Sequence, residues 1–342
     1  MNKTQKTRII RIVLFLGTAI SLYFVPWLLV KAWILPLPDT VQEQLEEAIG
    51  YGFEGMIVYI DQDGKPPQSL AAGWHDRESR IPAKPQAYFK IASISKLYDA
   101  IAVTKLVKAG RLSLDKTIVD YLPELEGRIE YADKITLRSM IQHRSGIPNF
   151  TDSPNFWAEP NQSYEESLAL ILDKPANFEP GEDYEYCNTN YLLLNRIMDQ
   201  VLGYPNFQFI QDEILTPLHL KNTFSSLKEV DLDQVMSGYH VGHPFDLKED
   251  EHGMVATAED VGIFLRALND GSVFNPGEKE IYSSIYEYEH GGWVPGYQSF
   301  ANYYEDLDAV IISFYSTTDP KLYNWNLSEI INSRIAKIIE RQ

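Results

Sequence analysis

The chain has 342 residues, 44% of them hydrophobic, which is enough for one large folded domain or two smaller ones. Its formal net charge of -18 repels phosphate backbones, and no basic stripe interleaved with aromatic residues follows the extreme N-terminus, so we expect no nucleic-acid partner. The single cysteine, Cys187, excludes a disulfide within one chain and a cysteine-rich metal site. The histidines show no metal-ligand spacing, so we expect neither a metal nor a cofactor.

The N-terminal segment combines positive charge with a long apolar run. Four basic residues precede an uncharged stretch from Ile12 to Val30. As a helix, this stretch is about as long as the hydrocarbon core of a bilayer is thick. We expect a cytoplasmic stub over 1–11, a single-pass signal anchor over 12–35 in the bacterial cytoplasmic membrane, and a domain over 36–342 outside it, periplasmic or extracellular. A cleaved signal peptide is the alternative, but no small-x-small site follows the run.

The expected elements after this run place strands at both chain ends and helices between them. Expected strands cover residues 55–61, 69–74, 281–288, 297–304 and 309–315. Helices are expected over 40–49, from Ser93 onward, over 137–143, 164–172, 190–202, 207–215 and 258–268, and over 327–339. This order predicts an α+β sandwich in which both chain ends build one antiparallel sheet and an all-helical region, about 100–275, is inserted.

Residues 89–96 read Phe-Lys-Ile-Ala-Ser-Ile-Ser-Lys and place a serine three residues before a lysine at an expected helix start. Residues three apart share one face of a helix, so the Lys96 amine can reach the Ser93 hydroxyl. A lysine becomes a base for a serine only where burial or nearby positive charge favours its neutral form. The same spacing occurs at Ser113 and Ser225, but only Ser93 follows an apolar run and precedes a long amphipathic helix.

Further landmarks follow Ser93 in a fixed order. They are Ala-Gly-Arg-Leu-Ser-Leu-Asp115, Val-Asp-Tyr-Leu-Pro123, Ile-Gln-His-Arg-Ser-Gly-Ile-Pro148 and Phe-Glu-Pro-Gly181. From about Gly55 to Tyr315 the chain resembles the serine β-lactamase and penicillin-binding-protein superfamily, in its class C-like branch. The resemblance implies the β-lactamase/transpeptidase-like fold, a serine nucleophile at Ser93, and a structural role for His143 within its landmark.

The second motif that the resemblance implies is Tyr-x-Asn, here Tyr186-Cys-Asn188. A tyrosine hydroxyl near a lysine cation readily becomes a phenolate, which suits proton removal from the serine or from water. The asparagine offers a donor and an acceptor to a substrate amide. Tyr204-Pro-Asn has the same letters, but the resemblance selects Tyr186, because the helix that contains Tyr-Leu-Leu-Leu194 is the one that follows the motif in relatives. Cys187 is interpreted as a filler.

The third motif is His290-Gly-Gly292, where relatives carry Lys-Thr-Gly or His-x-Gly on a strand that lines the site. Glycines allow a substrate backbone to approach the strand. A mostly neutral imidazole holds a substrate carboxylate less well than a lysine does, which favours a peptidase, amidase or esterase over a β-lactamase. His240-Val-Gly lacks the Pro-Gly-aromatic sequence and the strand that follow here.

By this resemblance, Ser93 attacks a carbonyl while Lys96, aided by Tyr186, accepts its proton, and Tyr186 later activates water. The oxyanion is expected between the backbone N–H groups of Ser93 and Trp293, which follows Gly292. Asn188 is expected to hold a substrate amide, and His290 to orient the site. Trp293 and the aromatic residues Tyr297 and Phe300 are candidates for the pocket wall, although some of them must face the core.

The predicted function is that of a membrane-anchored, exported serine hydrolase acting on D-amino-acid peptides or esters of the cell wall. Its expected partners are a small-molecule or peptide substrate and, through the N-terminal helix, a membrane. A β-lactamase and a general carboxylesterase remain alternatives. In another class, a catalytically silent penicillin-binding receptor or scaffold of the envelope is possible, but the three intact motifs argue against it.

Overall fold

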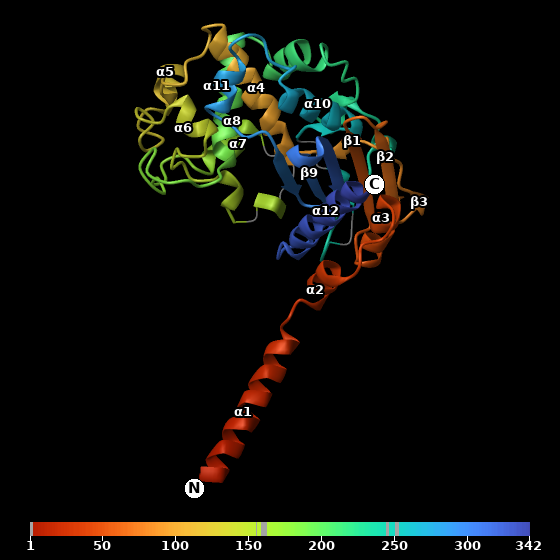
Figure 1. Cartoon of the computed structure of the whole chain (residues 1–342). Coiled ribbons are helices and arrows are strands. Elements are labelled where there is room, and N and C mark those ends of the chain that lie inside the picture. Colours follow the sequence, from red (N-terminus) through yellow and green to blue (C-terminus); the bar gives the residue numbers. More distant parts are fainter. Residues whose placement is uncertain (1–2, 155, 159–162, 244–245, 250–252) are drawn as a thin grey trace.

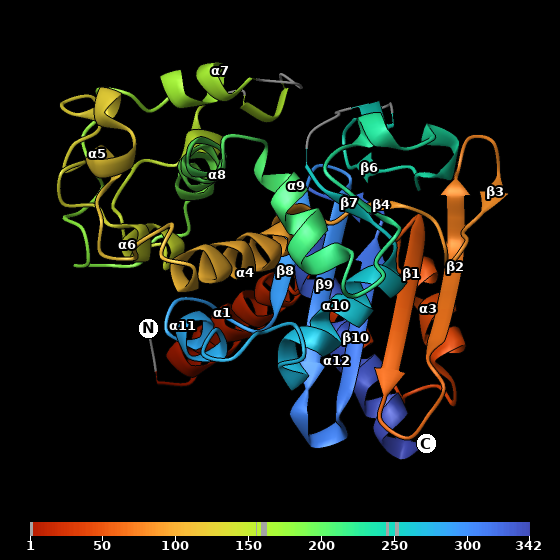
Figure 2. The same cartoon turned by 90° about the horizontal axis from the view of Figure 1, so that it is seen from above.

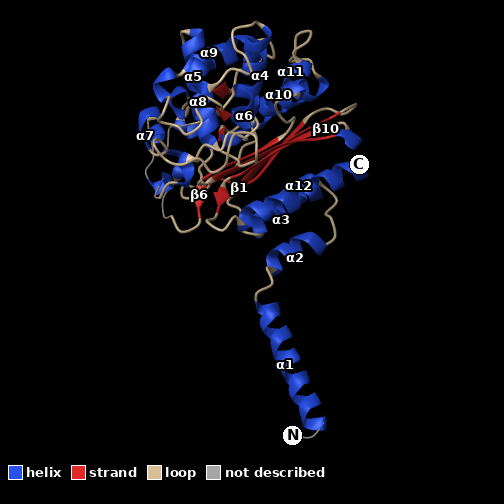
Figure 3. Cartoon of the chain, turned by 90° about the vertical axis from the view of Figure 1, so that its left-hand side faces the viewer, coloured by secondary structure: helices blue, strands red, loops and turns tan. Residues whose placement is uncertain are grey.

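A six-stranded antiparallel sheet lies at the centre of the protein, with helices on both of its faces (Figure 3). The computed structural model describes residues 3–154, 156–158, 163–243, 246–249 and 253–342. The strand order is β3-β2-β1-β10-β9-β8. The strands are β1 (Gly55–Gln62), β2 (Gln68–Asp76), β3 (Ile81–Pro82), β8 (His290–Val294), β9 (Tyr297–Tyr304) and β10 (Ala309–Tyr315). Because β1 pairs with β10, the two chain ends build one sheet, and the predicted α+β class is confirmed.

The side chains of β1 alternate between two hydrophobic cores. Ile57 and Tyr59 belong to the core under the large helical layer, whereas Met56, Val58 and Ile60 belong to the core on the opposite face. Successive strand residues point to opposite faces, so a strand covered on both sides is apolar at every position. The unbroken apolar run of β1 therefore explains its place in the middle of the sheet.

The larger layer consists of the inserted helices, which surround α4 (Ser95–Lys108) (Figure 2). Within this layer α10 (Ala258–Asp270) lies directly on the sheet, because a side chain at Gly262 would overlap the ring of Tyr59. The ring of Phe264 on α10 stacks on Tyr98 of α4, with centroids 3.6 Å apart. The other helices are α5 (Ile118–Tyr121), α6 (Leu137–Ile141), α7 (Tyr164–Ala169), α8 (Asn188–Leu202), α9 (Asn206–Ile210) and α11 (Lys279–Ser283).

The predicted all-helical region over 100–275 also contains short strands, and some of them join this layer to the chain near Ser93. β4 (Phe89–Lys90) and β5 (Thr223–Phe224) both pair with β7 (Val255–Ala256). A second small sheet pairs β6 (Tyr239–His240) with β11 (Thr317–Thr318) in parallel. β4 ends immediately before the turn that carries Ser93, so its pairing fixes the entry of the chain into that turn.

The predicted strand over 281–288 is wrong, because this segment begins inside helix α11 and ends in a turn. Its apolar residues Ile281, Tyr282 and Ile285 have helical as well as strand spacing, and the burial of Tyr282 decides between them. The residue before α11, Glu278, is buried against Lys105 of α4, with Nζ and Oε2 3.1 Å apart. Tertiary contacts therefore select the helix here.

Replacing Lys105 with methionine is expected to leave the Glu278 carboxylate buried without its cation. Breaking a buried pair by removing one partner typically lowers the free energy of unfolding by about 3 kcal/mol or more. Chemical denaturation of wild type and Lys105→Met measures this difference. An unchanged stability would contradict a structural role for the pair.

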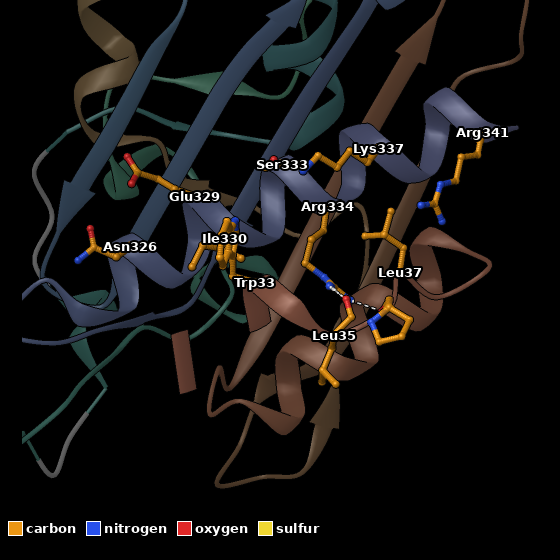
Figure 4. A pocket seen from close by; sticks show the side chains of 11 residues that line it. Trp33, Leu35, Leu37, Asn326, Glu329, Ile330, Ser333, Arg334, Lys337 and Arg341 are labelled. Carbon is orange, nitrogen blue, oxygen red and sulfur yellow. Dashed lines mark hydrogen bonds between the residues drawn. The ribbon is translucent and has the colours of Figure 1, made fainter. Parts of the chain in front are cut away.

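The smaller layer consists of α3 (Val41–Gly50), α12 (Tyr323–Arg341) and α2 (Trp27–Ile34). The buried guanidinium of Arg334 on α12 donates all of its N–H groups, to the carbonyls of Ala32, Leu35 and Pro36 and to the side chains of Gln44 and Glu47. Beside these contacts lies a groove of about 620 Å³ between α12 and the segment after α2 (Figure 4). Arg334 thus fastens the segment 32–36 to the domain.

The N-terminal apolar run is not one continuous helix. α1 (Lys3–Tyr23) projects away from the domain (Figure 1), and the chain bends at Pro26 before α2. Proline has no N–H and clashes with the preceding turn of a helix, so the break is expected at this residue. Among the described residues no single helix is long and apolar enough to cross a bilayer. Only Thr4–Tyr23 and Trp27–Ile34 taken together, with a bend of 77° between them, have the required length and hydrophobicity. A single anchor helix over 12–35 is therefore not what the structure contains.

Candidate active site

Ser93 and Lys96 lie side by side where the sheet meets the helical layer. The Lys96 Nζ donates hydrogen bonds to Ser93 Oγ and to Asn188 Oδ1, each 3.0 Å long. Ser93 sits in a 3₁₀ turn, Ala92–Ile94, and α4 begins only at Ser95. The side chain of Lys96 is 6% exposed, so its ammonium depends on these partners.

The backbone just before the serine is strained. Ala92 has a φ of 48°, which is a left-handed conformation that residues with a Cβ rarely adopt. Strain of this kind persists only where the surrounding structure enforces it, and it is common at functional sites. Here the turn presents the Ser93 hydroxyl toward Lys96 rather than into the core.

Asn188 begins α8 and is held by the loop that contains Asn149 and Thr151. Its backbone N–H donates to Asn149 Oδ1 at 3.0 Å, and its side-chain Nδ2 donates to Thr151 Oγ1 at 3.2 Å. Since its Oδ1 accepts from Lys96, the amide is already oriented by the protein. One Nδ2 hydrogen remains for a ligand, so Asn188 holds Lys96 in addition to the expected contact with a substrate amide.

Tyr186 brings its ring over the same lysine. The Lys96 Nζ lies 5.1 Å from the ring centroid. The Tyr186 hydroxyl is buried and has no hydrogen-bond partner among the residues that the structure describes. A buried hydroxyl without a partner is costly in a folded protein, which makes Tyr186 a candidate for a functional group of the site.

His143 is a residue of this site that the sequence reasoning assigned to a structural landmark only. Its ring stacks on Tyr186 with centroids 4.4 Å apart, and its Nδ1 accepts the backbone N–H of Cys187 at 3.0 Å. Burial above all, and then the charge of Lys96, lower the pKa of His143 to about 3. The imidazole is therefore neutral at pH 7 and positions Tyr186 through stacking. The Ile-Gln-His-Arg-Ser-Gly landmark was the available signal, but only the fold brings it to Tyr186.

His290, at the start of β8, lies near the same tyrosine. Its ring centroid is 6.2 Å from that of Tyr186 and 5.9 Å from that of Tyr286, on which it stacks. Burial, followed by the charge of Lys96, lowers the pKa of His290 to about 4, so this imidazole is also neutral at pH 7. Its Nδ1 donates to the Gly291 carbonyl, which leaves Nε2 as an acceptor.

Gly292 allows β8 to lie against the turn that carries Ser93. A Cβ at this position would overlap the carbonyl oxygen of Ile91 and the Oγ of Ser299, and would lie 3.1 Å from the Cβ of Ala92. The Ser299 hydroxyl also donates to the Ile91 carbonyl at 2.8 Å, which fastens the turn to β9. Since β8 is the last strand of its sheet, its outer backbone groups are not paired within that sheet.

Trp293, next to Gly292 on β8, belongs to a row of aromatic rings. Its ring meets Trp157 edge to face at 5.6 Å, and Trp157 meets Phe156 in the same way at 5.0 Å. The sequence reasoning missed Trp157, because it comes from a distant loop with no motif. Of the other pocket candidates, Tyr297 and Phe300 are buried in the two cores, so neither forms the wall of the site.

Cys187 lies between two site residues but faces away from the chemistry. Its side chain is buried, and Sγ lies 3.2 Å from the carbonyl oxygen of Ile147. Burial raises the pKa of this thiol, which keeps it in the unreactive protonated form. These contacts agree with a filler and do not favour a second nucleophile.

Curated relatives match this chain over part of their length. Protein flp of Staphylococcus aureus (strain MW2) is 28% identical over 193 residues, which is 55% of this chain and 39% of the relative. The N-acetylmuramyl-L-alanine amidase of Bacillus subtilis (strain 168) is 27% identical over 198 residues, 54% of this chain and 45% of the relative. The matched region thus spans less than half the length of these two relatives.

Solved structures with the same fold cover nearly the whole chain. D-amino acid amidase from Ochrobactrum anthropi SV3, complexed with D-phenylalanine, superimposes with a TM-score of 0.77 at 21% identity, covering 88% of this chain and 98% of the amidase. A penicillin-binding protein from Bacillus halodurans gives a TM-score of 0.72 at 19% identity, covering 87% and 99%. A family model described as Beta-lactamase matches residues 37–284. Because this match includes Ser93, Lys96 and Tyr186 and extends over most of the chain, the protein belongs to the beta-lactamase family.

Proposed function

We propose that the protein is a serine hydrolase that forms an acyl-enzyme on Ser93 and acts on amides or esters of D-amino acids, such as those of cell-wall peptides. The observation that carries the proposal is the hydrogen bond of 3.0 Å from Lys96 Nζ to Ser93 Oγ, in a site that also contains Tyr186. A nucleophile within hydrogen-bond reach of a base is the arrangement that acyl transfer requires.

In the first step the Ser93 oxygen forms a bond to the substrate carbonyl carbon. The serine proton passes to the Lys96 amine or, through it, to the Tyr186 oxygen. The backbone N–H groups of Ser93 and Trp293 stabilise the negative charge that develops on the carbonyl oxygen. Each such donor typically contributes about 10²–10³ to the rate. The carbon–nitrogen or carbon–oxygen bond then breaks, and the leaving group takes the proton.

In the second step water hydrolyses the serine ester. Tyr186 or Lys96 removes a proton from the water, the new carbon–oxygen bond forms, and Ser93 recovers its proton as the acid leaves. The neutral rings of His143 and His290 hold Tyr186 between them without adding a competing charge. Neither of these two steps requires a metal or a cofactor.

The choice of substrate rests on His290. A neutral imidazole offers no cation to a free carboxylate, so an uncharged amide or ester fits this strand better than a penicillin or a D-Ala-D-Ala terminus. The similarity to an N-acetylmuramyl-L-alanine amidase supports a wall-derived substrate, and the fold shared with a D-amino acid amidase supports the D configuration. A β-lactamase and a general carboxylesterase are the competing activities.

The test compares hydrolysis of D-phenylalanine amide, its L enantiomer, a chromogenic cephalosporin and a simple nitrophenyl ester, with Ser93→Ala as the control. We expect the D amide to be cleaved at least about tenfold faster than the L amide, which corresponds to a difference of about 1.4 kcal/mol in transition-state stabilisation. Efficient cleavage of the cephalosporin or of the ester, with none of the D amide, would replace the proposal with a β-lactamase or a carboxylesterase.

We also propose that α1 and α2, as a bent pair, anchor the domain in the bacterial cytoplasmic membrane, with the active site outside. The side chains described along α1 are exposed and largely apolar, and Trp27 and Trp33 of α2 are 56% and 72% exposed beside them. Tryptophans favour the membrane interface, which suits an α2 that lies at the bilayer surface after the bend. Arg334 would then hold the domain at a fixed distance from that surface.

Alkaline extraction of membranes from cells that express the full chain tests this anchor. The protein is expected to stay in the membrane pellet, and protease added outside the cytoplasm is expected to digest the domain. Release of the intact chain by alkali would contradict the anchor, and protection of the domain would contradict its orientation.

A further inference from the structure

The groove between α12 and the segment after α2 lies outside the active site (Figure 4). Its volume of about 620 Å³ is that of a site for a small molecule, for which roughly 300–1,000 Å³ is usual. The lining residues of α12 recur every three or four positions from Asn326 to Arg341, so they share one face of this helix. The opposite wall consists of Trp33 and residues 35–37.

Arg334 holds the two walls of the groove together. Its guanidinium donates to three backbone carbonyls within residues 32–36. The side chains of Gln44 and Glu47 accept its two remaining N–H groups, so Arg334 keeps no donor for a ligand. The groove is therefore formed before anything binds, and a ligand loses little affinity to the ordering of the chain.

The charge of the groove is opposite to that of the whole chain. Lys337 and Arg341 are exposed, and neither side chain has an ion pair or a hydrogen bond among the residues that the structure describes. Among the described residues that line the groove, Glu329 is the one acid, and its carboxylate accepts from Trp325 Nε1 at 3.0 Å. The chain has 48 acidic and 30 basic residues. A local excess of cations on such a protein attracts an anion.

The position of the groove indicates where this anion comes from. The groove lies on the side of the domain from which α1 projects (Figures 1 and 3). Trp33, which lines it, is 72% exposed, and the neighbouring Ile34 is 63% exposed. Tryptophan side chains favour the level of the lipid head groups. An occupant at this level has to match both the two cations and the apolar wall.

We propose that the groove binds the head group of an anionic phospholipid. Its phosphate lies between Lys337 and Arg341, since a guanidinium donates two parallel N–H groups to phosphate oxygens. The glycerol and the first carbons of the acyl chains lie along Trp33 and Leu37. A zwitterionic phospholipid adds a cation next to the phosphate and fits the groove less well. The inference rests on the proposed membrane anchor and is independent of the chemistry at Ser93.

The size of the lipid preference follows from the two cations. One lysine or arginine near an anionic lipid surface typically raises the binding constant about fivefold, and two raise it about thirtyfold. Native mass spectrometry of the full chain in a neutral detergent measures this preference, with phosphatidylglycerol and phosphatidylcholine of equal acyl chains added separately. We expect the Kd for phosphatidylglycerol to be at least about tenfold lower.

Variants separate the two parts of the site. In the double variant Lys337→Gln and Arg341→Gln the two lipids should bind within about twofold of each other, because the cations that distinguish them are gone. Trp33→Ala should weaken the binding of both lipids by a similar factor and keep the preference. A lost preference in Trp33→Ala, or a retained one in the double variant, would overturn the assignment of charge and apolar contacts.

Lys174→Gln combined with Lys221→Gln is the matched control. Both lysines are exposed and lie in the inserted region, away from α12, so the pair removes the same charge elsewhere. This variant should keep the full preference for phosphatidylglycerol, and an equal loss would show attraction by the overall charge instead of by the groove. Displacement of phosphatidylglycerol by an equal concentration of glycerol phosphate would show a site for a free anion and overturn the lipid as the occupant.

Thermal unfolding provides an independent readout, because a ligand that binds only the folded state stabilises it. Phosphatidylglycerol should raise the unfolding temperature of wild type and leave that of the Lys337 and Arg341 double variant unchanged. Failure of this inference is distinguishable from failure of the anchor. A chain that stays in the alkali-treated membrane pellet but shows no lipid preference overturns the groove alone, whereas release of the chain removes the membrane as the source of the lipid and overturns both.

Discussion

Replacing Lys96 with methionine is expected to slow the acylation of Ser93 by about 10²–10⁴-fold, the range that a positioned general base typically contributes. The Lys96 Nζ supplies the hydrogen bonds that join Ser93 to Asn188, and methionine cannot replace them. The fold should persist, because methionine has a similar length and suits a space bordered by the rings of Tyr186 and Tyr191. Fluorophosphonate reaction rates and thermal unfolding measure the two effects separately.

Lys105→Met is the matched control for this prediction. Lys105 lies on the same helix and is as buried as Lys96, but its partner is the structural carboxylate of Glu278. The expected pattern is the reverse of that for Lys96, with a large loss of stability and a reactive Ser93 in the protein that remains folded. If both variants lost stability alike and kept their reactivity, Lys96 would be a structural lysine.

Gly292→Ala is expected to reduce the activity by at least about 10²-fold while the two cores remain intact. The new Cβ would overlap the carbonyl oxygen of Ile91, a backbone atom that can move only if the turn carrying Ser93 moves with it. A displacement of about 1 Å at a reacting centre is enough for a loss of this size. The rate of hydrolysis of an activated ester and the unfolding temperature, measured together, report the two consequences.

Gly291→Ala is the neighbouring control. A Cβ at Gly291 would approach only the ring edge of Trp325, 2.7 Å away on the opposite face of the strand, and a side chain can rotate aside. Its activity should stay within a few-fold of wild type. Equal losses at both positions would indicate that β8 is sensitive to any side chain, and would remove the argument that Gly292 lets β8 lie against the turn that carries Ser93.

Much of the fold could be predicted from local pattern. The strands over 297–304 and 309–315 are confirmed at their bounds, because each ends at a turn and one or both of its faces are apolar. The segment 281–288 could not be assigned locally, since its spacing fits two periods and the burial of Tyr282 decides. Pro26 is a local signal for the bend before α2. The prediction of one helix gave more weight to the length of the apolar run.

Part of the candidate site could likewise be predicted from the sequence, and part of it could not. Motifs placed Ser93, Tyr186 and His290, and the structure brings all three to Lys96 or its neighbours. His143 carries no sign in the sequence of what it faces, because Tyr186 lies far away in the chain. Burial, which fixes the protonation of this imidazole, is a property of the tertiary structure alone.

Intact-mass spectrometry of the protein after exposure to a fluorophosphonate, beside Ser93→Ala, tests the central claim most directly. An activated serine is expected to give one adduct on wild type and none on the variant, and Lys96→Met should give it far more slowly. A parallel exposure to a penicillin tests the argument from His290, because a lasting adduct would show a pocket that accepts a free carboxylate without a cation on this strand. If wild type gave no adduct with either reagent, Ser93 would not be a nucleophile and the protein would be a silent member of its family.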